Sequence, residues 1–242
     1  MEFQYFGGEQ RSPEWFALRM GKVTASRLAD WMATSKAKNS LGKPLKARLD
    51  YEKEILFERT FNVSFDNYIS DAMQDGIDLE SYALKQYEAI TSNTVRSVGA
   101  WYNDYFVASP DGEILEKGKK MAEGLAEVKV VRDNTFTEIL SVGIPDKWTK
   151  QIQGQLWASD KKWCDFIAIN MNTKKLVIIR VEADPEFHDY LEAAIMEELV
   201  TGQLYDPSTT NIHSFVEGVV VEPDFTAFTA PPEEPTITNI DF

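Results

Sequence analysis

The sequence has few residues of the kinds that build disulfides, zinc sites or membrane spans. It contains one cysteine, Cys164, and two histidines in 242 residues, which excludes an intramolecular disulfide and does not support a Cys/His zinc centre. Cys164 lies in an apolar run, so we expect it to be a buried small hydrophobe. No apolar run approaches the roughly 20 residues of a membrane span, and the N-terminus lacks a signal pattern. These absences favour a protein of a reducing cytoplasm that does not bind membranes.

Positive charge is absent from the last quarter of the chain. The last basic residue is Arg180: residues 1–180 hold all 25 basic residues and 25 of the 39 acids, and residues 181–242 hold the other 14 acids. The net charge of −14 therefore belongs to the C-terminal region. The neutral remainder can still gather a local basic groove, because attraction of phosphate depends on the local field. Alternatively, the acidity only keeps the protein soluble.

The hydrophobic pattern predicts one α/β domain with a mixed central sheet flanked by helices. Helices are predicted over residues 12–19, 24–31, 44–59, 71–90, 133–142, 146–159 and 185–200. Strands are predicted over residues 94–98, 105–108, 125–131, 163–170 and 175–181. After residue 206 the chain becomes rich in Thr, Pro and acids, so we divide it into a domain, 1–206, and an acidic C-terminal tail or arm, 207–242.

The strand section contains two carboxylates and an ammonium in a distinctive pattern. Asp111 lies in Ala-Ser-Pro-Asp-Gly, and one hairpin later come Glu127 and Lys129 in Ala-Glu-Val-Lys-Val-Val. Strand residues two apart point the same way, so Glu127 and Lys129 share a face and Val128 points to the other. Carboxylates suit Mg²⁺, and a nearby lysine can orient water or neutralise charge on a phosphate, so the pattern fits phosphodiester hydrolysis. The alternative is a surface ion pair on an edge strand, with Asp111 in an ordinary turn.

Five motifs in order resemble those of the lambda exonuclease family, the YqaJ-like viral recombinases of the PD-(D/E)xK nuclease superfamily. They are Arg11–Ser26, Gly76–Glu80, Ser109–Gly112, Glu127–Lys129 and Gln151–Trp157. The resemblance covers residues 8–200 and implies a restriction-endonuclease-like core.

The resemblance also implies roles for individual residues. Its metal site would comprise Glu80, Asp111, Glu127 and the Val128 carbonyl, with Lys129 and Gln151 completing the catalytic set. Gln153 and Gln155 are weaker candidates, and a polar helix face is the alternative for all three glutamines. Its pocket for a terminal 5′-phosphate would comprise Arg19, Ser26 and Ser109. Otherwise Arg19 is a surface residue at a helix end and Ser109 shapes a turn.

A basic loop follows the second predicted helix. Its cations are Lys36, Lys38, Lys43, Lys46 and Arg48, with no acid between Asp30 and Asp50. The loop is a candidate track for a DNA backbone; the alternative is an ordinary solvated loop.

Together, the motifs and the resemblance predict a Mg²⁺-dependent 5′–3′ exonuclease, in which Mn²⁺ can substitute. It would digest linear double-stranded DNA from free ends to give 3′ single-stranded overhangs for annealing-type recombination. The resemblance implies a ring-shaped homotrimer, a single-strand annealing protein as partner, and a phage- or prophage-encoded origin in a bacterial host. We expect no nucleotide cofactor, because the sequence has no Gly-rich phosphate-binding loop. A structure-selective or site-specific endonuclease on the same fold, and a catalytically silent DNA- or protein-binding module, are the alternatives.

Overall fold

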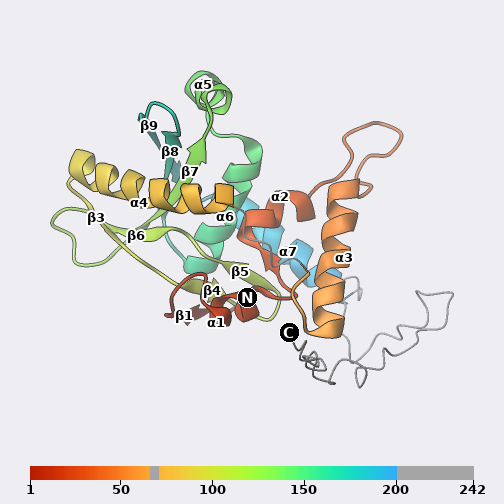
Figure 1. Cartoon of the computed structure of the whole chain (residues 1–242). Helices are drawn as coiled ribbons and strands as arrows, with labels where there is room; N and C mark the ends of the chain where they lie inside the picture. Colours follow the sequence, from red (N-terminus) through yellow and green to blue (C-terminus); the bar gives the residue numbers. More distant parts are fainter. Residues whose placement is uncertain (66–70, 201–242) are drawn as a thin grey trace, which may run out of the picture.

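The computed structural model describes residues 1–65 and 71–200, and within α4 and α7 it describes no side chains of residues 71–78 and 198–200. It forms two mixed sheets with helices packed around them (Figure 1). The predicted boundary at residue 206 and the acidic tail 207–242 lie outside the described residues. No helix in the described ranges is long and apolar enough to span a membrane.

The helices are α1 Pro13–Arg19, the 3₁₀ turn η1 Ala25–Arg27, α2 Leu28–Trp31, α3 Lys46–Phe61, α4 Asp71–Thr91, α5 Asp133–Val142, α6 Asp146–Ser159 and α7 Pro185–Val200. The strands are β1 Gln4–Phe6, β2 Val23–Thr24, β3 Thr94–Arg96, β4 Ala100–Tyr102, β5 Phe106–Ala108, β6 Gly112–Leu115, β7 Gly124–Val131, β8 Trp163–Asn170 and β9 Leu176–Glu182.

The larger sheet has the order β3-β6-β7-β8-β9, which places β7 at its centre. β6 and β7 form an antiparallel hairpin, whereas β7 and β8 run parallel, with Glu127 opposite Phe166. A parallel pair requires a crossover, and α5 and α6 supply it. The smaller sheet has the order β1-β4-β5-β2, in which only β2 and β5 are parallel.

Alternation along β7 decides which side chains meet which helix. Ala126 and Val128 pack with Ala83 and Tyr87 of α4. Leu125 belongs to the cluster on the opposite face, together with apolar residues of α5 and α6. Because side chains alternate along a strand, Glu127 lies on the α6 side of the sheet.

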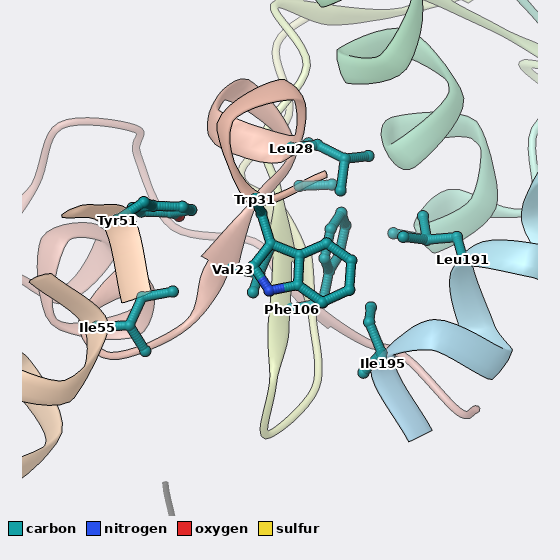
Figure 2. Packing of buried hydrophobic residues seen from close by; sticks show 11 residues of the cluster. Val23, Leu28, Trp31, Tyr51, Ile55, Phe106, Leu191 and Ile195 are labelled. Carbon is teal, nitrogen blue, oxygen red and sulfur yellow. The ribbon is translucent and has the colours of Figure 1, made fainter. Parts of the chain in front are cut away.

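A second core joins the N-terminal elements to α7. Trp31 is buried at its centre. Figure 2 shows the Trp31 indole with Tyr51 and Ile55 of α3 on one side and Leu191 and Ile195 of α7 on the other. Burying an aromatic ring of this size contributes about 1.5–3 kcal/mol or more, so this cluster holds α2 and α3 against the rest of the domain.

Most predicted elements are confirmed, and the departures have local causes. Ser12 caps α1 by accepting the Trp15 N–H at 3.2 Å, as its Ser-Pro start predicts. The helix expected after a Thr24 cap does begin at Ala25, but as the 3₁₀ turn η1, and the Thr24 side chain makes no capping hydrogen bond. Val23 and Thr24 pair with β5, and the Thr24 N–H donates to the Tyr51 hydroxyl at 2.9 Å. The next helix begins at Lys46 rather than at Pro44, which forms a β-bridge with Thr34.

The single central sheet was also an incomplete prediction. The prediction missed four strands, each only two to four residues long: β1, β2, β4 and β6. Runs this short show no clear alternation, and only their pairing with other strands identifies them. β1, for example, exists through its pairing with β4 almost a hundred residues later.

Candidate active site

The centre of the site is the Glu127 carboxylate on β7. Glu127 is only 2% exposed. Its Oε1 accepts hydrogen bonds from Lys129 Nζ and Gln151 Nε2, both at 2.6 Å, and its Oε2 accepts one from Gln155 Nε2 at 2.7 Å. Glu127 and Lys129 share a face, as predicted. A buried position on a central strand rules out the alternative of a surface ion pair on an edge strand.

The glutamines of α6 divide into two groups by helical spacing. Gln151 and Gln155 are four residues apart and therefore lie on one face, which meets Glu127. Gln153 points elsewhere: its amide binds the Glu182 carbonyl at 2.8 Å and the Asp184 N–H at 2.9 Å. The sequence ranked Gln155 with Gln153, and the structure places it with Gln151 instead.

A glycine lets α6 approach closely enough for these contacts. A Cβ added at Gly154 would lie 3.0 Å from side-chain atoms of both Leu28 and Phe106. A larger residue would require the Leu28 and Phe106 side chains, or α6 itself, to shift by a few tenths of an ångström. Gly154 therefore helps to set the position of Gln151 and Gln155 above the sheet.

Asp111 lies beside Glu127, at the turn into β6. Its Oδ2 accepts the Val128 N–H at 2.6 Å, and its own N–H donates to the Ala126 carbonyl at 3.0 Å. Removal from bulk water and then the neighbouring charge of Glu127 raise the pKa of Asp111 well above its usual value. The two carboxylates are thus close enough to repel each other and to favour a bound cation.

Lys129 supplies one positive charge to this pair. Burial opposes that charge, but the carboxylates of Glu127 and Asp111 outweigh it and raise the pKa of Lys129. The ammonium therefore stays protonated at the site. A charged lysine is an electrostatic group or a hydrogen-bond donor, and it is not a general base in this state.

Glu80 of α4 faces the same region from a cavity of about 480 Å³ that Asp111 also lines. Its charge contributes to the raised pKa of Asp111. Its Oε2 accepts a hydrogen bond at 2.9 Å from Arg11, a residue with a left-handed backbone (φ 68°). Arg11 is a partner that the sequence did not predict for Glu80.

The donor set fits a hard divalent cation. Asp111, Glu127 and Glu80 bring oxygen ligands of the kind Mg²⁺ prefers, and Mg²⁺ needs only one or two carboxylates with several waters. Among the side chains that the structure describes, no three acidic, histidine or cysteine groups already enclose a single point. The buried oxygen Gln155 Oε1, beside Glu127, accepts no hydrogen bond from any residue that the structure describes. A water bound to a metal ion at this site could donate to it.

A second cavity, of about 300 Å³, lies between α1 and α3 and contains Arg19. Arg19 Nη2 is 3.4 Å from Ser26 Oγ, and its guanidinium lies 4.2 Å from the centre of the Trp15 ring. Desolvation lowers the pKa of Arg19, but the side chain is only half-buried, so an anion can reach the guanidinium. The structure therefore brings Arg19 and Ser26 together.

Ser109 is connected to this cavity through Trp15. Trp15 Nε1 donates to Ser109 Oγ at 2.9 Å, while the Trp15 ring carries Arg19 on its face. Ser109 is also only two residues from Asp111. The two regions therefore meet at the Ser109–Asp111 turn.

The five cations of the basic segment fall into two groups, three exposed on the loop and two in ion pairs within α3. Lys36, Lys38 and Lys43 are exposed on the loop between α2 and α3, which projects from the body of the molecule (Figure 1). Lys46 pairs with Asp50, and Arg48 pairs with Glu52 at 2.7 Å. Intrahelical pairing of the last two leaves the first three as the stronger candidates for contact with DNA.

Three contacts of the site had no clear signal in the sequence. They are the Arg11–Glu80 pair, the Trp15–Ser109 hydrogen bond and the Tyr51 hydroxyl, which binds Thr24. Each joins elements far apart in the chain. The contact of Gln155 with Glu127 is different, because the spacing of four residues between Gln151 and Gln155 is a signal in the sequence.

Comparisons with known proteins agree with this geometry. The model of the YqaJ-like viral recombinase domain matches residues 14–162. An alkaline exonuclease from Laribacter hongkongensis is 31% identical, with a TM-score of 0.64, over 80% of this chain and 95% of its own. Its complex with dAMP gives a TM-score of 0.65 over the same shares.

A phage-related exonuclease from Haemophilus somnus 129PT is 15% identical, with a TM-score of 0.54 over 72% of this chain and 90% of its own, and shows the fold alone. No curated protein matches the chain. The predicted resemblance, the mixed α/β nuclease fold and the enzyme class are confirmed. With a family model matching well over half of its length and this active-site geometry, the chain belongs to the YqaJ-like viral recombinase family.

Proposed function

We propose that the protein is a Mg²⁺-dependent deoxyribonuclease that digests linear double-stranded DNA from a 5′ end. It leaves a 3′ single strand for annealing-type recombination. The observation that carries this proposal is the buried Glu127 carboxylate, bound by Lys129, Gln151 and Gln155 and adjacent to Asp111. Burying a cluster of charged groups costs free energy, and such clusters are therefore found mainly where function requires them.

Asp111 and Glu127 would hold the cation, with Glu80 and the Val128 carbonyl as further ligands. When bound, Mg²⁺ would polarise the phosphate and lower the pKa of a coordinated water, and Mn²⁺, which also suits oxygen ligands, can substitute. Glu80 shares a cavity with Asp111 and is held by Arg11. Arg11 therefore keeps the third carboxylate in place at the site.

Lys129 and the glutamines act on the reacting groups and on their geometry. Hydrolysis adds a water oxygen to phosphorus and breaks the bond to the leaving oxygen, which takes a proton. The charged Lys129 ammonium orients the water or neutralises charge that develops on the phosphate. Gln151 and Gln155 hold the Glu127 carboxylate in one orientation from the α6 side.

The Arg19 cavity supports a preference for chain ends. Arg19 offers planar donors for phosphate oxygens, and Ser26 and Ser109 add hydroxyl groups near it. The related Laribacter hongkongensis enzyme forms a complex with dAMP, a 5′-phosphorylated mononucleotide. A terminal 5′-phosphate held at Arg19 would place the end of the strand close to Asp111, because Ser109 links the two regions.

Assembly and partners follow from the same family. We infer a ring-shaped homotrimer around the duplex, with Lys36, Lys38 and Lys43 toward the DNA backbone, and a single-strand annealing protein that receives the product. The acidic residues 207–242 would form a tail or arm outside the 1–206 nuclease domain, away from the DNA. The proposed setting is the cytoplasm of a bacterial host of a phage or prophage.

One digestion experiment tests the proposal. Linear duplex DNA with 5′-phosphate ends, the same DNA with 5′-hydroxyl ends, and a covalently closed circle are each incubated with Mg²⁺ and with a chelator. We expect Mg²⁺-dependent release of nucleotides that is fastest from 5′-phosphate ends and absent from the circle. Cleavage of the closed circle would instead establish an endonuclease, and binding without cleavage of any DNA would establish a catalytically silent module.

A further inference from the structure

The cavity that contains Arg19 is lined by aromatic rings as well as by cations. Phe16 of α1 and Phe65, which follows α3, both line it, and they are 41% and 54% exposed. Lys22 adds a second cation to the lining. Flat apolar rings that stay exposed around a charged hollow are typical of a ligand site.

The acids that line the cavity are already bound. Glu54 accepts a hydrogen bond from Arg27 at 3.0 Å. Glu58 accepts two backbone N–H groups, from Gly21 at 2.7 Å and from Phe65 at 3.1 Å. Glu54 is thus paired with Arg27, whereas Glu58 keeps its charge and acts on Arg19. The cations of the lining, Arg19, Lys22 and Arg27, still outnumber its two acids, so an incoming anion meets a net positive charge.

The same Glu58 carboxylate holds the two edges of the cavity together. One edge is the turn after α1, where Gly21 has a left-handed backbone (φ 68°) that favours glycine. The other edge carries Phe65, whose ring meets Phe57 edge-to-face at 5.4 Å. Both edges therefore have a defined position relative to α3.

Phe16 is connected to the cation of the cavity through Trp15. The Phe16 and Trp15 rings meet edge-to-face at 5.1 Å, and the Arg19 guanidinium lies 4.2 Å from the centre of the Trp15 ring. Phe16, Trp15 and Arg19 are thus in contact through the Trp15 ring, so the exposed aromatic ring and the proposed phosphate-binding cation hold fixed positions relative to each other.

We propose that Phe16 and Phe65 form a stacking site for the base of the 5′-terminal nucleotide, whose phosphate lies at Arg19 and Ser26. The proposal rests on the proposed 5′-phosphate pocket and adds a second subsite to it. A hollow of about 300 Å³ lies at the lower end of the range of small-molecule sites, which suits a ligand of the size of one nucleotide. Stacking tolerates any base, because every base has a π-face, which suits an enzyme that acts on ends of any sequence.

The test compares 5′-phosphorylated duplexes that differ only in whether the terminal nucleotide carries a base or an abasic tetrahydrofuran. Binding is measured by fluorescence anisotropy in chelator, so that the DNA is not cut. We expect the wild type to prefer the end with a base. Phe65→Ala and Phe16→Ala should each weaken that binding roughly 5- to 100-fold and leave binding of the abasic end unchanged.

Phe61→Ala is the matched control. Phe61 belongs to the same aromatic cluster, 4.9 Å from Phe57, and is 60% exposed, but it does not line the cavity. We expect this variant to bind both ends like the wild type. The result that contradicts the proposal is an equal loss of binding to the end with a base in Phe61→Ala and Phe65→Ala, or a lower mass of both variants in light scattering. Either result would assign the aromatic cluster of Phe57, Phe61 and Phe65 to a subunit interface.

Two further outcomes separate the subsite from the pocket on which it rests. Equal weakening of both ends by Phe65→Ala and Phe16→Ala would show that the rings only support the fold, and would overturn the stacking site. Arg19→Ala is measured in parallel on 5′-phosphate and 5′-hydroxyl ends. If that variant kept the preference for phosphate, the phosphate pocket would be wrong, whereas the dependence on the terminal base would still report on Phe16 and Phe65.

Discussion

The two parts of the site are built in different ways. The Glu127 cluster lies on the central strand of a buried sheet, and three hydrogen bonds of 2.6–2.7 Å hold its carboxylate. The Arg19 cavity is formed by a seven-residue helix, a turn and the end of α3, and its Arg19–Ser26 contact is 3.4 Å long. Ser26 is exposed, whereas Glu127 is buried.

The difference indicates that the Glu127 cluster serves catalysis and the Arg19 cavity serves recognition of DNA ends. Groups that stabilise a transition state must be positioned before the substrate arrives, and a packed core does this best. Groups that recognise an end can complete their geometry on contact with the substrate. Substitutions in the Glu127 cluster should therefore lower turnover on every substrate, and those in the Arg19 cavity should change which ends are used.

The largest effect is expected from Lys129→Ala. Loss of a charge that contacts the transition state costs about 3–4 kcal/mol, or ~10²–10³-fold in kcat. Asp111→Ala and Glu127→Ala should be at least as damaging, because each removes a proposed metal ligand. Nucleotide release from linear duplex DNA is the measurement, with circular dichroism to confirm folding. Lys150→Ala, which removes a surface pair with Asp146, is the control that should retain activity; near-normal activity of a folded Lys129→Ala protein would contradict the mechanism.

The next effect separates the glutamines of α6. Gln155→Ala removes a hydrogen bond to a buried carboxylate, worth about 1.5–3 kcal/mol, so we expect kcat to fall about 10- to 100-fold. Gln153→Ala should lower the melting temperature and leave kcat nearly unchanged, because its amide joins α6 to the segment after β9. If both variants lost turnover equally, the assignment of Gln155 to the site would be wrong.

Arg19→Ala should have a smaller and more selective effect. A charge-assisted hydrogen bond to a terminal phosphate contributes about 1.5–3 kcal/mol. Digestion should therefore slow about 10- to 100-fold on 5′-phosphate ends and much less on 5′-hydroxyl ends. Initial rates on the two substrates are compared within one preparation; equal slowing on both would assign Arg19 to the fold or to the DNA backbone.

The smallest effect on cleavage is expected from truncation after Asp206. The removed residues carry no Lys or Arg, so they cannot attract DNA by charge. Digestion of short duplexes should stay within about twofold of the full chain. Assembly, followed by light scattering, or binding to the annealing protein should change instead. Loss of cleavage with normal assembly would place the tail in the active site.

Long elements and short motifs were readable from the sequence. α5 and α6 have the predicted bounds, because Gly143 marks the end of α5 and Pro145 marks the start of α6. That Glu127 and Lys129 share one face of the strand followed from strand periodicity alone. By contrast, β1, β2, β4 and β6 were missed, because strands this short are stabilised by partners that lie elsewhere in the chain.

By itself, the sequence determined the order of the longer helices and strands, the family motifs and the residue types of the site. These are local properties, set by spacing and by side-chain chemistry. Tertiary structure alone decided that Glu127 is buried, that Gln155 rather than Gln153 binds it, and that Arg11 meets Glu80. The physical reason is that burial and long-range hydrogen bonds depend on how helices pack on the sheet, and close approaches such as that of α6 at Gly154 exist only in the folded chain.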